Sequence, residues 1–247
     1  MHHFFVEPEQ ILGDEAQITG SDVNHIRNVL RMQPGEELQV RTGQDSISYR
    51  CRIERFEADK VVLQIMWKEE KGTELPSRIV LFQSLPKSDK MELIIQKAVE
   101  LGAARIVPVS SARCIMKLEG GKAQTRLKRW NAISESAAKQ SGRMIIPEVT
   151  GVMTFQQALA YAATLDVRLI PYEKAEDISY TRKVLSGIAP GQSVGIFIGP
   201  EGGFDPKEIE LARQAGAEAV TLGRRILRTE TAGMTLIAAL MLQLEQG

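Results

Sequence analysis

Short runs in which apolar and polar residues alternate make up about the first seventy residues of the chain, a pattern typical of half-buried strands. The strands that this pattern predicts are residues 4–6, 37–41, 46–53 and 60–67. One helix interrupts them, because Val23 and Ile26 recur at helical spacing after Ser21 or Asp22, either of which can cap a helix. This part of the chain is therefore predicted to be a small β domain.

Longer apolar runs and helical stripes alternate after Pro76. In chain order they predict strand 78–83, helix 89–101, strand 105–109, helices 122–141 and 155–164, strands 167–170 and 193–198, helix 206–215, strand 219–222 and helix 231–245. Short connections between strand, helix and strand favour a parallel sheet with crossover helices. The second part of the chain is predicted to be α/β.

The segment 68–76 separates the two patterns, because it is charged, poor in apolar residues and closed by Gly72 and Pro76. A chain of 247 residues is long enough for two modest domains. We therefore predict one domain over residues 1–72 and a second over residues 73–247.

Overall composition excludes several protein classes. Lys and Arg number 31 and so do Asp and Glu, and 43% of the residues are hydrophobic, which is typical of a globular protein. No apolar run approaches the 18 or more residues that span a bilayer, and the N-terminus lacks a signal-peptide pattern, so we expect a cytoplasmic protein without a membrane segment. Cys51, Cys114 and the three histidines show no metal-ligand spacing, so no metal site is expected.

The zero net charge hides an uneven distribution along the chain. Residues 1–72 carry nine basic and thirteen acidic side chains, whereas residues 105–143 carry nine basic and two acidic ones, a net charge of +7. Such a basic stretch is either a solvated helix face or a surface that binds phosphates. Composition alone leaves both interpretations open.

A glycine-rich loop, 198–204, joins a strand to a helix that begins with Asp205 as cap, Pro206 at its first position and Glu208 at its third. Ligands of open α/β sheets bind beyond the carboxyl ends of strands, and glycines let the backbone approach a ligand closely. A plain tight turn is the alternative. The loop matches neither a dinucleotide fingerprint nor a phosphate loop with Gly-Lys-Ser/Thr.

A second strand-to-helix loop, 222–232, concentrates arginines around a carboxylate. Helix capping by Thr229 or Thr231 would account for the threonines, and the helix dipole would account for Glu230. Cations are disfavoured at a helix N-terminus unless an anion or polar ligand lies there, so capping leaves Arg224, Arg225 and Arg228 unexplained.

These two loops, with K-M-E-L-I-I-Q-K-A-V-E-L-G at 90–102 and Q-S-G-R at 140–143, resemble the 16S rRNA (uracil-1498-N3) methyltransferase family of the SPOUT superfamily. N-H-I at 24–26, V-L-R-M at 29–32 and Pro34-Gly35 resemble the PUA-like RNA-binding domain of that family. These segments span nearly the whole chain. Their combination in this order is far more specific for the family than either loop alone.

The resemblance implies a SPOUT-type parallel sheet flanked by helices, with a C-terminal trefoil knot, preceded by a small PUA-like β-barrel. It also implies a homodimer that uses S-adenosyl-L-methionine to methylate N3 of one uridine in 16S rRNA, within the small ribosomal subunit. The cofactor-binding positions carried over are Leu169, Ile170, Pro171, Gly199, Pro200, Glu201, Gly202, Gly203, Leu222, Gly223, Arg225, Ile226 and Leu227.

Methylation of uracil N3 requires loss of a proton, so we look for a base and for a cation that stabilises the uracilate. Arg228 is the predicted stabilising group. Glu230 either acts as the base or orients Arg228, and Glu201 is the other candidate base. The predicted RNA contacts are Arg31, Arg113, Lys122, Arg126, Arg129 and Arg143.

Two positions depart from the family pattern, which commonly has an arginine where this chain has His3 and an acid where it has Lys139. Two other function classes are the alternatives. A non-catalytic RNA-binding protein could keep the fold, and an α/β nucleotide hydrolase would need the Gly-Lys-Ser/Thr loop that the chain lacks. The last helix carries an apolar stripe that would serve either a dimer interface or the sheet of its own domain, at Leu236, Ile237, Leu240, Met241 and Leu244.

Overall fold

The computed structural model describes residues 1–70, 72–116, 118, 120–175 and 177–245. Its contacts divide the chain into two units. One consists of Met1–Glu74 with Ala138–Ile146, and the other of Leu75–Ala137 with Pro147–Gly247. The segment 138–146 thus belongs to the first unit, which differs from the prediction of a single boundary after residue 72.

Six strands form the sheet of the first unit, in the order β1-β4-β5-β6-β3-β2. β1 and β4 are parallel, and the other pairs are antiparallel. Among the described residues the two outer strands of this order, β1 and β2, do not pair with each other, so closure into a barrel stays a prediction. The strands are β1 (His3–Phe5), β2 (Ile11–Leu12), β3 (Glu15–Thr19), β4 (Glu37–Arg41), β5 (Ser48–Phe56) and β6 (Lys60–Glu69).

The core of this unit collects the apolar residues that alternate along its strands, including Ile18, Leu38 and Ile53. The sequence-based prediction missed β3, whose alternation is short. The predicted helix is present as one turn, α1 (Ser21–Asn24), that continues as a π-helix, η2 (His25–Val29). Its N-cap is Gly20, so the prediction of a Ser21 or Asp22 cap is wrong. A short 3-10 helix, η1 (Pro8–Gln10), precedes β2.

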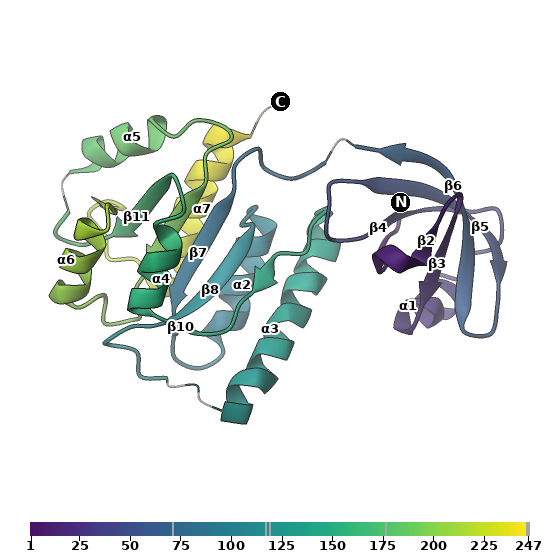
Figure 1. The fold of residues 1–247 in the computed structure, drawn as a ribbon, viewed down its shortest axis with the longest axis horizontal. Helices are drawn as coiled ribbons and strands as arrows, with labels where there is room; N and C mark the ends of the chain where they lie inside the picture. The colour runs from purple at the N-terminus through teal and green to yellow at the C-terminus, as the bar shows by residue number, and fades with distance from the viewer. Residues whose placement is uncertain (71, 117, 119, 176, 246–247) are drawn as a thin grey trace. The chain divides into compact units, whose positions relative to one another are not determined.

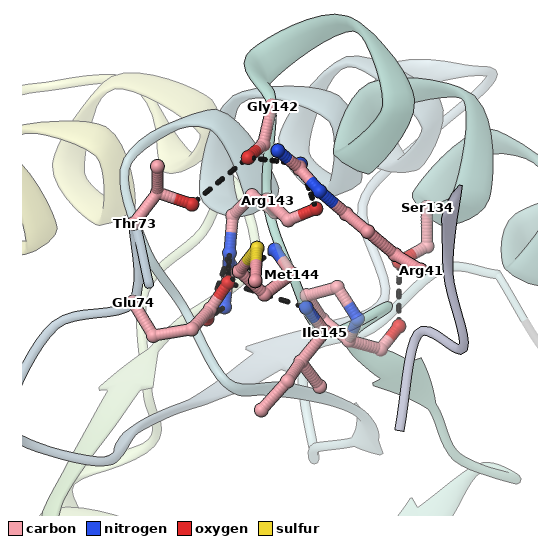
Figure 2. A network of polar contacts seen from close by, with 9 residues as sticks. Arg41, Thr73, Glu74, Ser134, Gly142, Arg143, Met144 and Ile145 are labelled. Carbon is pink, nitrogen blue, oxygen red and sulfur yellow. Dashed lines mark hydrogen bonds and ion pairs between the residues drawn. The ribbon is translucent and has the colours of Figure 1, made fainter. Parts of the chain in front are cut away.

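A buried polar network fastens the segment 138–146 to the first unit, and Figure 2 shows its side chains converging. Glu74 forms an ion pair with Arg143, and its carboxylate also accepts hydrogen bonds from the Met144 amide at 2.9 Å and the Ile145 amide at 3.3 Å. Arg41 donates to the carbonyl oxygens of Gly142 and Arg143 at 2.6 and 2.9 Å. These bonds explain why the segment belongs to this unit.

The carboxylate of Glu74 stays charged inside this network. Burial alone would raise its pKa, but the Arg143 guanidinium and the two backbone amides outweigh burial and hold the pKa below the ordinary value. Arg143 itself is 4% exposed. This ion pair is therefore a structural element of the first unit.

The second unit contains a parallel sheet of seven strands, in the order β10-β8-β7-β12-β11-β13, with β9 also paired to β8. All of these pairs are parallel, as the sequence predicts. The strands are β7 (Ile79–Ser84), β8 (Arg105–Ser110), β9 (Glu148–Val149), β10 (Met153–Thr154), β11 (Val167–Pro171), β12 (Val194–Ile198) and β13 (Glu218–Val220).

Helices cover both faces of this sheet (Figure 1). Val80 and Phe82 of β7 pack in one core with residues of α4 and α6, whereas Leu81 lies beside Gly233 of α7 on the other face, where α2 contacts α7. The helices are α2 (Lys90–Glu100), α3 (Gly120–Ser141), α4 (Phe155–Ala162), α5 (Ile178–Ser186), α6 (Pro206–Gln214) and α7 (Thr229–Leu244). The sequence-based prediction missed α5, β9 and β10. The α/β class with a parallel sheet flanked by helices is confirmed.

The apolar stripe of α7 is covered by its own domain. Leu236, Ile237, Leu240 and Leu244 are each at most 1% exposed within the single chain. Burial against the sheet therefore explains most of the stripe without a partner. Leu242, which is 77% exposed, is the large apolar side chain that α7 leaves uncovered.

Candidate active site

Three of the predicted ligand segments meet along the carboxyl-terminal edge of the parallel sheet, which is the side on which its strands end. β11 lies between β12 and β13, and all three strands point the same way. Their carboxyl ends lead into residues 171–172, 199–203 and 221–227. The fold thus brings together segments that are far apart in the sequence, at the edge where ligands of α/β sheets bind.

The glycine-rich loop after β12 has the local structure that the sequence predicts. Asp205 caps α6 and Glu208 completes a capping box with it, while Pro206 is the first helical residue. Gly203 has φ +66°, and a Cβ placed on it would meet no atom within 4 Å. The backbone of the loop therefore has open space beside it.

Gly199 differs from the other glycines of this loop. A Cβ at Gly199 would lie 3.2 Å from the backbone nitrogen of Phe204 and 3.3 Å from the carbonyl carbon of Gly203. Substitution there would strain the loop itself. Gly202 has no positive φ, and its added Cβ would come no closer than 3.8 Å to Arg113, so Gly202 is the cleaner position at which to obstruct a ligand.

Arg113 holds this loop from the segment that follows β8. Its guanidinium donates to the Gly202 carbonyl at 2.9 Å and lies 3.4 Å from the Asp205 carboxylate. The Ala112 amide donates to Glu208 at 2.8 Å. Arg113, predicted as an RNA contact, thus has a structural role at the glycine-rich loop, and its side chain remains 45% exposed.

The start of α7 is linked to the same loop through Thr229. Its hydroxyl donates to the Gly199 carbonyl at 2.6 Å and accepts from Gln83 Nε2 at 2.9 Å. The helix begins after Arg228, and no side chain caps it. The capping role predicted for Thr229 is therefore wrong. Thr229 instead connects β7, the loop after β12 and α7, because its hydroxyl reaches the carbonyl of the adjacent loop.

The two candidate carboxylates, Glu201 and Glu230, lie around one lysine, Lys90, that is not among the predicted site residues. Lys90 Nζ lies 3.4 Å from Glu201 and 3.3 Å from Glu230. Glu230 therefore pairs with Lys90, and the predicted pairing of Glu230 with Arg228 is absent among the described residues. A lysine in the first turn of a helix is electrostatically disfavoured, and this was the signal that could have found it.

Glu201 is ionised at neutral pH. Burial would raise its pKa, but backbone N–H groups, including that of Lys87 at 3.0 Å, and the Lys90 ammonium hold the pKa below the usual value. A carboxylate in this state is a good hydrogen-bond acceptor and a weak base. Its side chain is 29% exposed, so it remains accessible from solvent.

The loop after β13 presents cations and one apolar side chain to solvent. Arg224, Arg225 and Arg228 are solvent-accessible, and no ion pair is formed by any of the three within the part of the chain that is described. Ile226 is 89% exposed, and Gly223 has φ +104° with open space where a Cβ would stand. This combination suits an anionic or aromatic ligand better than water alone.

The other predicted cofactor positions differ in how deeply their side chains are buried. Leu169 and Ile170 are fully buried in the sheet and can offer only backbone atoms to a ligand. Pro171, Leu222 and Leu227 are half-buried, Pro200 is buried, and Gly202 is exposed at the loop surface. A ligand at this edge would therefore contact mainly the backbone.

The predicted RNA contacts on α3 are accessible to solvent. Arg129 pairs with Glu92 at 2.6 Å and is 68% exposed, Arg126 lies 3.9 Å from Asp89, and Lys122 is exposed. Lys117 and Glu119 of the basic stretch lie outside the described residues.

Two further arginines predicted as RNA contacts have opposite outcomes. Arg31, in the first unit, is exposed and has φ +54°. Arg143 is buried against Glu74, so its prediction as an RNA contact is wrong: a phosphate could reach its guanidinium only by breaking that ion pair.

No cluster of three or more metal-ligating side chains is found among the described residues. None of the described helices is both long and apolar enough to cross a membrane.

Comparison with known proteins places the chain. A family model described as an RNA methyltransferase domain matches residues 73–241, and one described as an RNA methyltransferase PUA domain matches residues 18–66. Ribosomal RNA small subunit methyltransferase E of Bacillus subtilis is 37% identical over 252 residues, covering 99% of this chain and 98% of the relative. The chain belongs to the ribosomal RNA small subunit methyltransferase E family. The family resemblance predicted from the two loops is confirmed.

Solved members of the methyltransferase E family and similar structures share the whole fold. Methyltransferase E of Neisseria gonorrhoeae, bound to S-adenosyl methionine, is 34% identical with a TM-score of 0.84, and the match covers 98% of this chain and 97% of that one. A Legionella pneumophila protein described as a methyltransferase, in complex with its bound cofactor SAM, is 32% identical with a TM-score of 0.83, over 97% and 96%.

Proposed function

We propose that this protein uses S-adenosyl-L-methionine to methylate N3 of one uridine in 16S ribosomal RNA of the small subunit. The observation that carries the proposal is the meeting of three strand-to-helix loops at one sheet edge, with glycine backbone left open beside accessible arginines. Two similar solved proteins, each covering nearly this whole chain, have the same cofactor bound. The uridine position, 1498, and the N3 atom follow from the family resemblance.

The residues at this edge fit the cofactor. Backbone groups of Leu169–Pro171, Gly199–Gly203 and Leu222–Leu227 would hold its adenosine and amino-acid parts, because glycines and buried side chains leave mainly the backbone to contact a ligand. Within the last of these segments the side chains of Arg225 and Ile226 are exposed, so both can also contact the cofactor. When bound, the cofactor supplies an activated methyl group on a sulfonium.

The protein's own task is to make uracil N3 nucleophilic. The N3 proton leaves water-exposed uracil only well above neutral pH, so the site must favour the uracilate. Arg228 is the proposed group, since it is a solvent-accessible cation directly before α7 and can face the developing negative charge. Glu201 and Glu230 are the candidate bases, and both pair with Lys90; backbone N–H groups and that ammonium lower the pKa of Glu201 and make it a weaker base. We therefore assign the larger part of the rate acceleration to stabilisation of the uracilate by Arg228.

RNA binding is proposed for the first unit and for α3. Arg31 lies in the first unit, and Lys122, Arg126 and Arg129 form the accessible basic face of α3. Phosphate contacts by such groups position RNA and make its affinity depend on salt. In this proposal Arg113 holds the glycine-rich loop through the Gly202 carbonyl and Asp205.

The finer features of the proposal rest on the family resemblance. They are a trefoil knot in the C-terminal segment, a homodimer and action in the cytoplasm. Leu242 on α7 is the exposed apolar side chain that a dimer would cover. A dimer is testable by light scattering, where a monomer would have a mass of 27.4 kDa.

Isotopic methyl transfer tests the proposed function. The purified protein, given methyl-labelled S-adenosylmethionine and either naked 16S rRNA or small subunits that lack the modification, is expected to label RNA in one of the two substrates. Digestion to nucleosides should place the label in 3-methyluridine. Cofactor binding without transfer to either substrate would favour the alternative of a non-catalytic RNA-binding protein, and label in another nucleoside would contradict the N3 assignment.

A further inference from the structure

The side chain of Lys90 is unusual for its place in the fold. It is the first residue of α2, directly after the N-cap Asp89, where the helix dipole opposes a positive charge. Its side chain is nevertheless only 30% exposed, and its ammonium lies between two carboxylates. Those carboxylates compensate for the unfavourable position.

Lys90 connects three elements of the second unit. Glu201 belongs to the loop after β12 and Glu230 to the first turn of α7, and both lie within 3.4 Å of Lys90 Nζ on α2. Glu201 also accepts a hydrogen bond from the Lys87 amide at 3.0 Å. The same two elements, the loop after β12 and α7, meet again through Thr229 and the Gly199 carbonyl. Lys90 thus lies where the glycine-rich loop and the start of α7 are brought together.

The charges of this cluster do not balance. Two carboxylates face one ammonium, and Glu230 is the more buried of the two, with 15% of its side chain exposed. Of the other charged groups on neighbouring segments, Asp89 faces Arg126 and Arg113 faces Asp205, whereas Arg228, directly before α7, forms no ion pair among the described residues. Removal of Lys90 would therefore leave Glu201 and Glu230 near each other without a cation within 4 Å among the described residues.

We propose that Lys90 is a positioning residue for methyl transfer: its ammonium, bound by Glu201 and Glu230, holds the glycine-rich loop against the first turn of α7. This assignment rests on the proposed function. Because Lys90 fixes the first turn of α7, it also fixes the position from which Arg228, two residues before Glu230, faces the uracil. Lys90 touches neither substrate nor cofactor in this scheme and acts through the two carboxylates.

The consequence for pH dependence has a definite sign. Backbone N–H groups and the Lys90 ammonium both lower the pKa of Glu201, so removal of Lys90 should raise that pKa. Glu201 would then be ionised only at higher pH. Methyl transfer by a Lys90→Met variant should therefore be lost at the acidic end of the pH range and recover as the pH increases, whereas a purely structural role would lower the rate at every pH.

Single-turnover methyl transfer between about pH 5 and about pH 9 tests this assignment, with Lys90→Met, Lys90→Arg and Lys97→Met as variants. Lys97 is the matched control, because it lies on the same helix and pairs with Glu100 of that helix at 2.7 Å. We expect Lys90→Met to lose at least about tenfold at the acid end and to move the acid limb upward by about one pH unit. Lys90→Arg should restore the profile, and Lys97→Met should match the unaltered chain.

A second readout does not need activity. Carboxyl carbon NMR of glutamate-labelled protein, without cofactor or RNA, follows the titration of Glu201 and Glu230, assigned by Glu201→Gln and Glu230→Gln. In Lys90→Met at least one midpoint should rise while thermal unfolding still shows a folded protein. Unchanged midpoints, or a rate loss of equal size at every pH, would overturn the assignment.

The two experiments separate this inference from the proposed function. If the unaltered chain transfers no methyl group to 16S rRNA, the proposed function fails. The carboxyl titration then still decides whether Lys90 controls the two carboxylates.

Discussion

Two ion-pair clusters of the molecule use similar side chains for different ends. In the first unit, Glu74, whose side chain is 15% exposed, pairs with the buried Arg143, and two backbone amides donate to the same carboxylate. In the second unit, Glu201 and Glu230 share a single lysine, Lys90, whose side chain is 30% exposed, against 5% for that of Arg143. The first cluster is balanced, with one carboxylate on a buried cation, whereas the second is unbalanced, with two carboxylates on a cation that solvent reaches.

The difference indicates which cluster contributes to stability and which to chemistry. A balanced pair in the interior has no capacity left for a ligand, and removing one partner leaves a buried charge. An unbalanced cluster at a loop can change its charge or contacts when a ligand arrives, and water screens a cation that is 30% exposed more than one that is 5% exposed. We therefore expect substitutions at the first cluster to destabilise the fold and substitutions at the second to alter reactivity.

The largest stability effect is expected at the balanced pair. Glu74→Gln leaves the Arg143 guanidinium buried without this counter-ion, which should cost about 3–5 kcal/mol of unfolding free energy. Urea unfolding at neutral pH measures it. The matched control is Glu148→Gln, whose exposed pair with Arg105 should contribute less than about 1 kcal/mol. Equal losses in the two variants would contradict the contrast between buried and exposed pairs.

The same pair gives a pH dependence of stability. The pKa of Glu74 is lower in the folded state than its ordinary value of 4.5, so its contribution is fully present above that value and is lost as the pH falls through the lower folded pKa. Unfolding measured from neutral pH downward should become easier in this acid window for the unaltered chain. Glu74→Gln should lack that part of the decline, and an identical decline would assign it to other carboxylates.

The largest kinetic effect is expected at Arg228. Arg228→Ala should lower the single-turnover rate at saturating RNA by at least about a hundredfold, roughly 2.7 kcal/mol of barrier, because the uracilate loses its stabilising cation. Cofactor affinity from calorimetry should be nearly unchanged. Exposed Arg182 on α5 is a matched control, and its alanine variant should retain the rate. An unchanged rate for Arg228→Ala would remove it from the mechanism.

A smaller effect is expected on cofactor binding at the glycine-rich loop. Gly202→Val adds bulk where the backbone is open and φ is ordinary, so it should weaken binding by at least about tenfold, or about 1.4 kcal/mol, without lowering the melting temperature. Gly151→Val is the control, since that exposed glycine also has open space and no positive φ. Normal affinity in Gly202→Val would place the cofactor elsewhere.

The smallest effect per residue is expected on α3. The double variant R126E/R129E should bind RNA more weakly and show a shallower dependence of affinity on salt, by about 0.7–0.9 in log–log slope for each phosphate that the protein no longer neutralises. The double variant R182E/K183E on α5 makes the same charge change outside the proposed RNA surface. If both double variants behave alike, α3 contributes only net charge and no specific RNA contacts.

Local signals made part of the candidate site predictable. The loop 199–203 and the start of α6 are marked by glycines, Asp205, Pro206 and Glu208, all within one short stretch, and the structure has the capping box that this stretch predicts. The parallel sheet is predictable for a similar reason, because most of its strands and helices carry their own periodicity.

Long-range contacts made the rest unpredictable. Gln83 and Thr229 form a hydrogen bond although they lie 146 residues apart in the sequence, so Thr229 looks like an ordinary helix cap from its neighbours alone. Arg143 looks like one more cation of a basic stretch, and only the return of 138–146 to the first unit places it against Glu74, 69 residues away. Lys90 carried a usable signal, since a cation in the first turn of a helix needs an explanation.

The most direct test of the proposed methyl transfer compares 16S rRNA from cells with and without the gene for this chain. We predict that one uridine, at the position numbered 1498 by the family resemblance, carries an N3 methyl group only when the gene is present. A plasmid that encodes the unaltered chain should restore it, and one that encodes Arg228→Ala should not. The same methylated uridines in both strains would contradict the proposed function.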